Sequence, residues 1–174
     1  MNSDFRNILS QSIHEKDILV LCILTKGQEN DVKKLELYSL LFDADKRVSD
    51  NAAWVFTHFD HLNNKWLFDK QDELIEEVMR TTSETKRRLI LTMLLRQPFT
   101  PEHIRTDFLD FCLGNITSFH EPIGVKTLSM KLAFEQSQFF PELLSELKST
   151  LEIMETEALS AGLKSIRKKL LKKM

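Results

Sequence analysis

The sequence predicts an all-α protein, a helical solenoid that forms a single domain over residues 1–174. Its 174 residues include only four glycines and four prolines, too few for the many turns of a β-sandwich or barrel. Apolar residues recur at helical spacing, and no segment alternates long enough to form a strand. A two-helix unit also recurs along the chain. Together these observations favour stacked pairs of helices.

The clearest helix is expected within residues 47–59, around which the rest of the chain is organised. The small Ala52 and Ala53 would let a neighbouring helix approach closely, and we expect Trp54 to be buried beside them. The remaining apolar positions recur at the spacing of an amphipathic helix that has neighbours on more than one side. The apolar stripe consists of Val48, Ala52, Val55, Phe56 and Phe59.

Start and stop signals divide the chain into about ten helices. In the first half, Ser3 is expected to cap the first helix and Gly27 to end the second. Asp45 is placed to cap the helix of the central stretch, and Ser83 or Thr82 the sixth helix. The first helix is short and carries Phe5, Ile8 and Leu9, and the next five are expected at about residues 15–26, 31–42, 46–61, 66–80 and 84–96.

The second half contains four more helices, whose starts are marked by proline or serine. Thr100 followed by Pro101 is a strong helix start, and Gly114 is expected to end that helix. Pro122 and Pro141 open the next two helices, and Ser160 precedes the last. These helices are expected at about residues 101–114, 122–138, 141–155 and 161–174.

Helices four to nine fall into three antiparallel pairs, preceded by a degenerate pair, which makes roughly four pairs in all. The best internal match aligns residues 51–55 with 87–91 and 126–130, at offsets of 36 and 39 residues. One helix pair cannot bury its apolar stripe alone, whereas stacked pairs cover one another. The first and last helices would then cap the stack.

With this repeat, the chain resembles the HEAT/armadillo class of helical repeats, and in particular small single-domain HEAT-like proteins of bacteria. The resemblance covers about residues 15–174 and depends on residues 47–59, 85–89 and 120–126. Arg87 and Lys126 stand where HEAT repeats often carry a basic residue, whereas Asn51 departs from that pattern. The resemblance implies a right-handed α-α superhelix and a scaffold or binding role, without indicating a ligand.

Charge is distributed unevenly along the chain. The net charge is −2, yet the last twelve residues hold six lysines and arginines and no acid. The rest of the chain therefore carries 18 basic and 26 acidic residues. This balance provides no general attraction to nucleic acid or to an anionic membrane.

The two cysteines, Cys22 and Cys112, each lie in an apolar helical run, where we expect buried thiols rather than a disulfide. The N-terminus lacks the pattern of a signal peptide. The longest apolar run, residues 18–24, is far shorter than the ~20 residues that span a bilayer. The expected location is cytoplasmic.

No catalytic or cofactor-binding motif stands out, and we expect no cofactor, small-molecule substrate or enzyme activity. The sequence lacks a Gly-rich phosphate loop, a Cys-x-x-Cys pair and a nucleophile elbow. His58 and His61 would lie one turn apart on the fourth helix and could share a metal. Polar residues near a helix end are the simpler interpretation, so no metal site is predicted.

Four carboxylates of the fifth helix form a candidate interaction face: Asp72, Glu73, Glu76 and Glu77. They face away from the apolar stripe of that helix, so a solvated surface is the favoured interpretation. The alternative is an acidic groove that binds a basic peptide. Such a groove would also draw on Asp69, Asp107, Asp110, Glu142 and Glu146.

The basic last helix is a second candidate surface. Cations near a helix C-terminus are stabilised by the helix dipole, so a simple cap is the favoured interpretation. The alternative is binding to phosphates or to an anionic surface. The basic residues are Lys164, Arg167, Lys168, Lys169, Lys172 and Lys173.

Two functions are weighed. The leading hypothesis is a non-enzymatic scaffold that binds another protein or a peptide, including a basic one. The rival is a nucleic-acid-binding or DNA-repair enzyme of HEAT-like fold, an analogy at the level of fold alone. Binding to DNA requires a basic concave face, and the acidic body of this chain disfavours it.

Overall fold

The computed structural model describes residues 5–154 and 158–174, which form helices and connecting turns without a strand. The predicted all-α class is confirmed. The chain divides into two compact units, Met1–Gln97 and Pro98–Met174, and each is described by itself. The prediction of a single domain stays a prediction.

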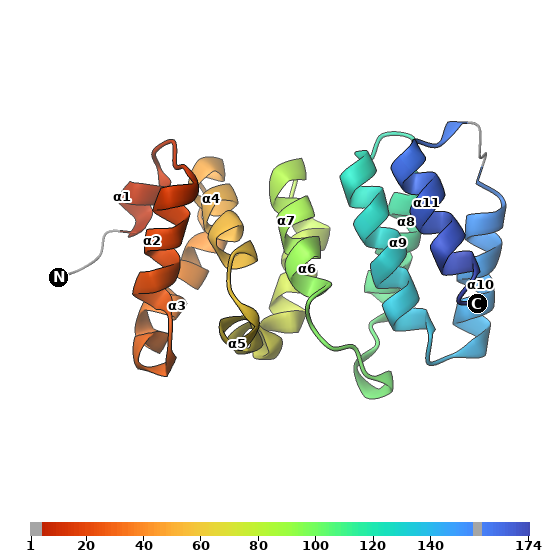
Figure 1. Cartoon of the computed structure of the whole chain (residues 1–174), viewed down its shortest axis with the longest axis horizontal. Coiled ribbons are helices and arrows are strands. Elements are labelled where there is room, and N and C mark those ends of the chain that lie inside the picture. The colour runs from red at the N-terminus through yellow and green to blue at the C-terminus, as the bar shows by residue number, and fades with distance from the viewer. Residues whose placement is uncertain (1–4, 155–157) are drawn as a thin grey trace. The chain divides into compact units, whose positions relative to one another are not determined.

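In the first unit, three helices lie side by side (Figure 1), and the remaining helices pack around them. The central one is α4, which contacts α2 on one side and α7 on the other. Helix α1 packs on α4, α3 packs on α2, and α6 packs on α7. The helices are α1 (Phe5–Leu9), α2 (Glu15–Thr25), α3 (Asp31–Ser39), α4 (Lys46–Thr57), α5 (His61–Asn64), α6 (Gln71–Arg80) and α7 (Glu84–Leu94).

Local signals set most boundaries of this unit where they were expected. Gly27 follows α2 with φ +85°, a conformation that glycine adopts without strain. The Asp45 carboxylate accepts from the backbone N–H of Arg47 at 2.8 Å and so caps α4. Ser83 caps α7 by accepting from the N–H of Lys86 at 3.3 Å. The predicted cap Ser3 lies outside the described residues.

The central helix is buried as predicted, but Trp54 is not part of its core. Val48, Val55 and Phe56 are each 0 % exposed. Trp54 is half-buried, with its ring 6.0 Å from that of His58. The prediction of a buried Trp54 is therefore wrong, because its position flanks the stripe that faces α2 and α7.

Two predicted boundaries in this unit differ from the structure. The helix expected to reach residue 61 ends at Thr57, because Asp60 caps the separate helix α5 by accepting from the N–H of Asn63 at 2.9 Å. The helix expected from residue 66 is a 3-10 turn over Lys65–Lys70 before α6 begins. Leu67 of that turn is fully buried, so tertiary packing outweighs local helix propensity here.

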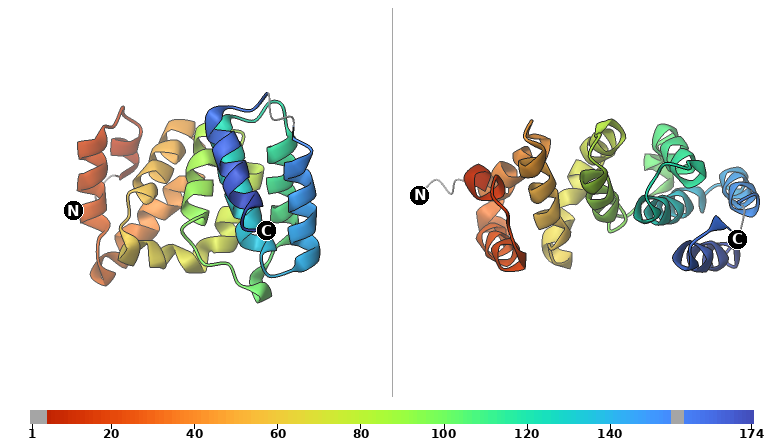
Figure 2. Two further views of the ribbon diagram at one scale, coloured as in Figure 1. Left: turned by 45° about the vertical axis from the view of Figure 1, so that its right-hand side comes forward. Right: turned by 90° about the horizontal axis from the view of Figure 1, so that it is seen from above.

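In the second unit, α8 and α10 both pack against α9, and α11 packs mainly on α9 (Figure 2). The antiparallel pair expected at residues 122–138 and 141–155 corresponds to α9 and α10, where α10 covers the described part of the second range. The predicted pairing of 84–96 with 101–114 joins the two units and stays a prediction. The helices are α8 (Thr106–Thr117), α9 (Ile123–Ser137), α10 (Pro141–Glu152) and α11 (Ala161–Leu171).

Helix α8 begins and ends later than predicted. Pro101–His103 forms only a 3-10 turn, and Ile104 is extended with ψ 129°, which breaks the helix. The helix then continues through Gly114, because Asn115 is buried and donates to the Ser129 hydroxyl of α9 at 3.1 Å. A contact with another helix thus overrides the local stop signal.

The internal repeat is reflected in burial. The fifth position of each aligned segment is Val55, Leu91 or Met130, and each is 0 % exposed. The second position varies, since Ala52 is buried whereas Arg88 is exposed. The repeat therefore preserves the residues that face neighbouring helices rather than the whole segment.

Candidate functional site

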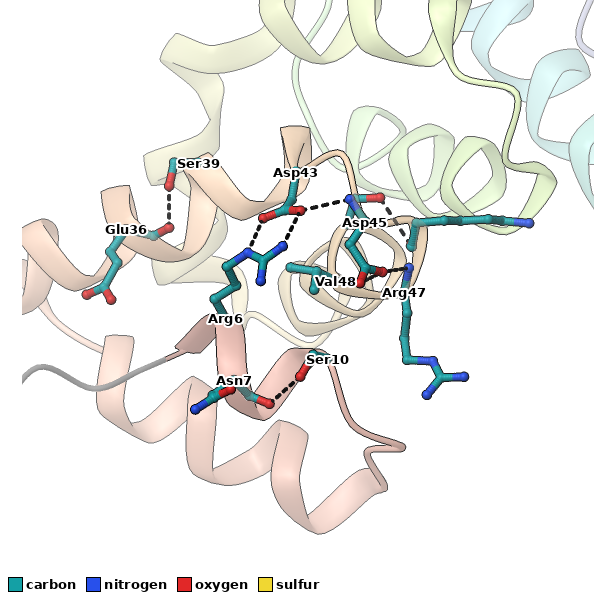
Figure 3. A network of polar contacts seen from close by, with 11 residues as sticks. Arg6, Asn7, Ser10, Glu36, Ser39, Asp43, Asp45, Arg47 and Val48 are labelled. Atoms are coloured by element: carbon teal, nitrogen blue, oxygen red, sulfur yellow. Dashed lines mark hydrogen bonds and ion pairs between the residues drawn. The ribbon is translucent and has the colours of Figure 1, made fainter.

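One hollow in the first unit is open and polar, with a volume of about 620 Å³. It lies beside the polar network of Figure 3, in which the Arg6 guanidinium donates to both oxygens of Asp43 at 2.8 and 3.2 Å. This bond, followed by the backbone N–H of Asp45, lowers the pKa of the Asp43 carboxyl. The hollow is lined by Ser10, Asp45, Lys46, Arg47, Asp50, Asn51 and Thr85.

The polar side chains of this hollow mostly hold the helices together. Asn51 donates to the carbonyl oxygens of Leu9 at 2.8 Å and Gln11 at 3.2 Å, which attaches α4 to the end of α1. Asp50 accepts from the Ser83 hydroxyl at 2.7 Å, which attaches α4 to the start of α7. The hollow also carries charges of both signs. These features indicate a structural role.

A second hollow, of about 300 Å³, gathers three of the four predicted acidic residues. Glu73 and Glu76 of α6 are exposed and line it together with Phe42, whose side chain is 36 % exposed. Asp72 is exposed but does not line the hollow. We call this site the acidic hollow, and it is lined by Phe42, Glu73, Glu76, Glu77 and Arg80.

The prediction that all four carboxylates face solvent is wrong for Glu77, which is 4 % exposed. The packing of α6 on α7 brings the Lys86 ammonium within 2.5 Å of one Glu77 oxygen. The Arg80 guanidinium lies 2.5 Å from the other. The charge of Glu77 is therefore balanced within the chain, and the exposed carboxylates at the hollow are Glu73 and Glu76.

An aromatic cluster centred on Tyr38 lies behind the acidic hollow. The Tyr38 ring meets Phe42 edge-on at 5.3 Å and Trp66 at 5.8 Å. Tyr38 is 5 % exposed, so its hydroxyl is buried. Burial, followed by the negative charge of Glu73, raises its pKa well above the usual range.

Tyr38 was not among the residues predicted to be functional, although the sequence carries a signal for it. Tyr38 and Phe42 are spaced i, i+4, and Tyr38 is the only tyrosine in the chain. The Lys70 ammonium lies 6.0 Å from the centre of the Tyr38 ring and 5.8 Å from that of Trp66. The aromatic cluster therefore already holds one cation against its faces.

The basic last helix packs on α9 and α10, and two of its six basic residues contact other parts of the second unit. The Arg167 guanidinium donates to the carbonyl oxygens of Leu151 at 2.5 Å and Glu152 at 3.3 Å, at the end of α10. The Lys173 ammonium lies 5.4 Å from the Phe134 ring. The exposed remainder, Lys164, Lys168, Lys169 and Lys172, stays a predicted interaction surface.

The remaining candidate groups are the two cysteines and the histidines His58 and His61. Both cysteines are free, as predicted, but only Cys112 is buried, whereas Cys22 is half-buried. Burial and then Asp60 raise the pKa of Cys22 to about 11, and burial raises that of Cys112 further. His58 follows the last turn of α4 and His61 begins α5. The prediction that both histidines lie on one helix is therefore wrong. Over residues 5–154 and 158–174, no three potential ligands gather at one place.

The second unit carries an apolar hollow of about 430 Å³. Two of its lining residues are strongly exposed, Phe119 at 98 % and Ile153 at 77 %. Exposed apolar residues around a hollow are typical of surfaces that contact other proteins. This surface was not predicted from the sequence.

Helices stacked into a layer, with a recurring buried position, define a helical-repeat protein. The chain belongs to the HEAT repeat family, because the family model described as a HEAT repeat domain matches residues 5–174. No match was found among curated proteins or among solved structures. None of the described helices is long and apolar enough to cross a membrane.

Proposed function

We propose that the protein is a non-enzymatic, cytoplasmic HEAT-repeat module that binds a basic segment of another protein at the acidic hollow. The observation that carries the proposal is the pairing of two exposed carboxylates, Glu73 and Glu76, with the exposed Phe42 at one concave site. HEAT repeats generally serve protein interaction rather than catalysis. The high pKa of both thiols also argues against a cysteine nucleophile.

The hollow suits a lysine or arginine side chain. Its volume of about 300 Å³ stands at the lower end of the range for ligand pockets. Carboxylates bind ammonium and guanidinium groups by charge-assisted hydrogen bonds, and an aromatic ring stabilises a cation over its face. Glu77 is buried against Lys86 and Arg80, whereas Glu73 and Glu76 are exposed at the hollow, so an incoming cation would reach these two carboxylates.

The binding of nucleic acid is less favoured. The carboxylates at the acidic hollow repel phosphates, and Arg167 and Lys173 of the basic helix already have contacts within the chain. The exposed lysines of α11 do not line any of the hollows described above. Duplex DNA therefore serves as the competing ligand in the test.

We expect the double variant Glu73→Gln/Glu76→Gln to bind a basic peptide at least about tenfold more weakly than the wild type, because it loses two charge-assisted contacts. The probe is a fluorescein-labelled peptide of alternating lysine, arginine and serine, followed by fluorescence anisotropy. Wild-type affinity should also fall as salt rises, since exposed charges are screened.

The matched control for this test is Asp72→Asn, which removes an exposed acid of the same helix outside the hollow. It should change the affinity much less than the double variant. Equal binding by the double variant and the wild type would refute the proposed site. Tighter binding of duplex DNA than of the peptide would favour the rival function.

A further inference from the structure

Within the described part of the chain, helix α2 has an apolar face that no other helix covers. Its inner residues Ile18 and Leu21 are 0 and 1 % exposed. On the opposite side, Leu19, Val20 and Ile23 are 53, 55 and 69 % exposed. A helix that is apolar all round is typical of one covered on two sides. The face formed by Leu19, Val20 and Ile23 is called the outer face of α2 below.

The position of α2 in the first unit explains why this face is open. Helix α4 is covered by α2 and by α7, whereas the contacts of α2 are with α3 and α4. Among the helices that lie side by side in Figure 1, α2 is thus the end member. In a helical repeat, the neighbouring repeat buries such a face. The outer face of α2 is therefore suited to another helix.

We propose that a second copy of this chain covers the outer face, with the two α2 helices packed antiparallel about a twofold axis. A twofold contact requires a self-complementary surface, because each residue meets the partner's surface in the same way. The apolar stripe meets this requirement, since Leu19, Val20 and Ile23 lie around the middle of α2. The proposal is independent of the acidic hollow.

The charges at the two ends of α2 also fit this arrangement. Glu15 and Lys26 are both exposed and stand eleven residues apart, close to three helical turns, so they lie on one edge of the outer face. Antiparallel packing places the start of one helix against the end of the other. Glu15 of each copy then lies near Lys26 of the other, which makes two opposite-charge contacts.

The contact of one helix face is small. Stable complexes bury roughly 1,200–2,000 Å² in total, and contacts below that range are weak. We therefore expect a dimer whose population rises with protein concentration, rather than a permanent assembly. Sedimentation velocity over a concentration series measures this directly.

The first variant is Ile23→Glu, which should raise the dimer dissociation constant at least about tenfold, because it places two like charges at the contact. Ile23 is 69 % exposed, so the variant should fold, and circular dichroism checks this. The matched control is Leu62→Glu on α5, where the side chain is 76 % exposed and outside the proposed contact. It should dimerise as the wild type does.

Charge reversal tests the antiparallel geometry itself. Glu15→Lys alone and Lys26→Glu alone should each weaken the dimer, whereas the double variant Glu15→Lys/Lys26→Glu should restore it with the charges exchanged. A chain that stays monomeric across the series would overturn the proposal. So would a dimer that Ile23→Glu leaves unchanged, or a double variant that is no stronger than the single ones.

Discussion

Replacing Phe56 with alanine should lower the free energy of unfolding by about 3–5 kcal/mol, the usual cost of removing a buried large aromatic side chain. Phe56 is 0 % exposed, and its ring lies 4.9 Å from Phe59 and 5.9 Å from Tyr38. Truncation would leave a cavity at the centre of the first unit. Neighbouring helices relax only partly into such a cavity, which is why the cost exceeds simple loss of apolar area.

Denaturant melts followed by tryptophan fluorescence suit this measurement, because the only two tryptophans, Trp54 and Trp66, both belong to the first unit. The signal therefore reports that unit even if the second unfolds separately. The matched control is Trp54→Ala, read from the remaining Trp66. It should cost less, because Trp54 is half-buried. A larger loss for Trp54→Ala than for Phe56→Ala would contradict this account of the core.

The second large effect is expected at the buried ion pair between Glu77 and Lys86. Replacing Glu77 with leucine should destabilise the first unit by about 3–5 kcal/mol, because it leaves the Lys86 ammonium buried without its partner. Lys86 is 5 % exposed and Glu77 is 4 % exposed, so water does not compensate either charge well. Arg80 is largely exposed and should contribute less.

A double-mutant cycle separates the ion pair from simple loss of packing. The variant Glu77→Leu/Lys86→Met removes both charges and should be clearly more stable than Glu77→Leu alone, since no buried charge remains unpaired. Denaturant melts of the wild type, both single variants and the double variant provide the four values. Additive losses would show that the two side chains do not interact.

The sequence predicted the class of fold and much of the helix pattern from local information. The stripe from Val48 to Phe59 is buried as expected, and the caps Asp45 and Ser83 begin α4 and α7. These features depend on residues close together in the chain, namely a periodic apolar stripe and a side chain that caps the next turn. The match of the HEAT repeat domain to residues 5–174 is consistent with them.

The acidic hollow was only partly predictable. The spacing of Glu73 and Glu76 places both on one helix surface, and the structure leaves both exposed beside Phe42. The same spacing predicted that Glu77 faces solvent. The sequence does not show that Lys86 of a neighbouring helix lies against this carboxylate. No periodic pattern shows which charged residue of a neighbouring helix will meet a given carboxylate.

By itself, the sequence determined that this chain is a stack of amphipathic helices, because burying an apolar stripe requires a neighbour wherever the stripe lies. Only the tertiary structure decided which side chains face that neighbour. In the structure, Trp54 is half-buried and Glu77 is buried against Lys86. Helix α8 continues beyond Gly114, and the outer face of α2 is exposed. Each of these outcomes depends on packing between helices, and the free energy of that packing comes from residues distant in the sequence.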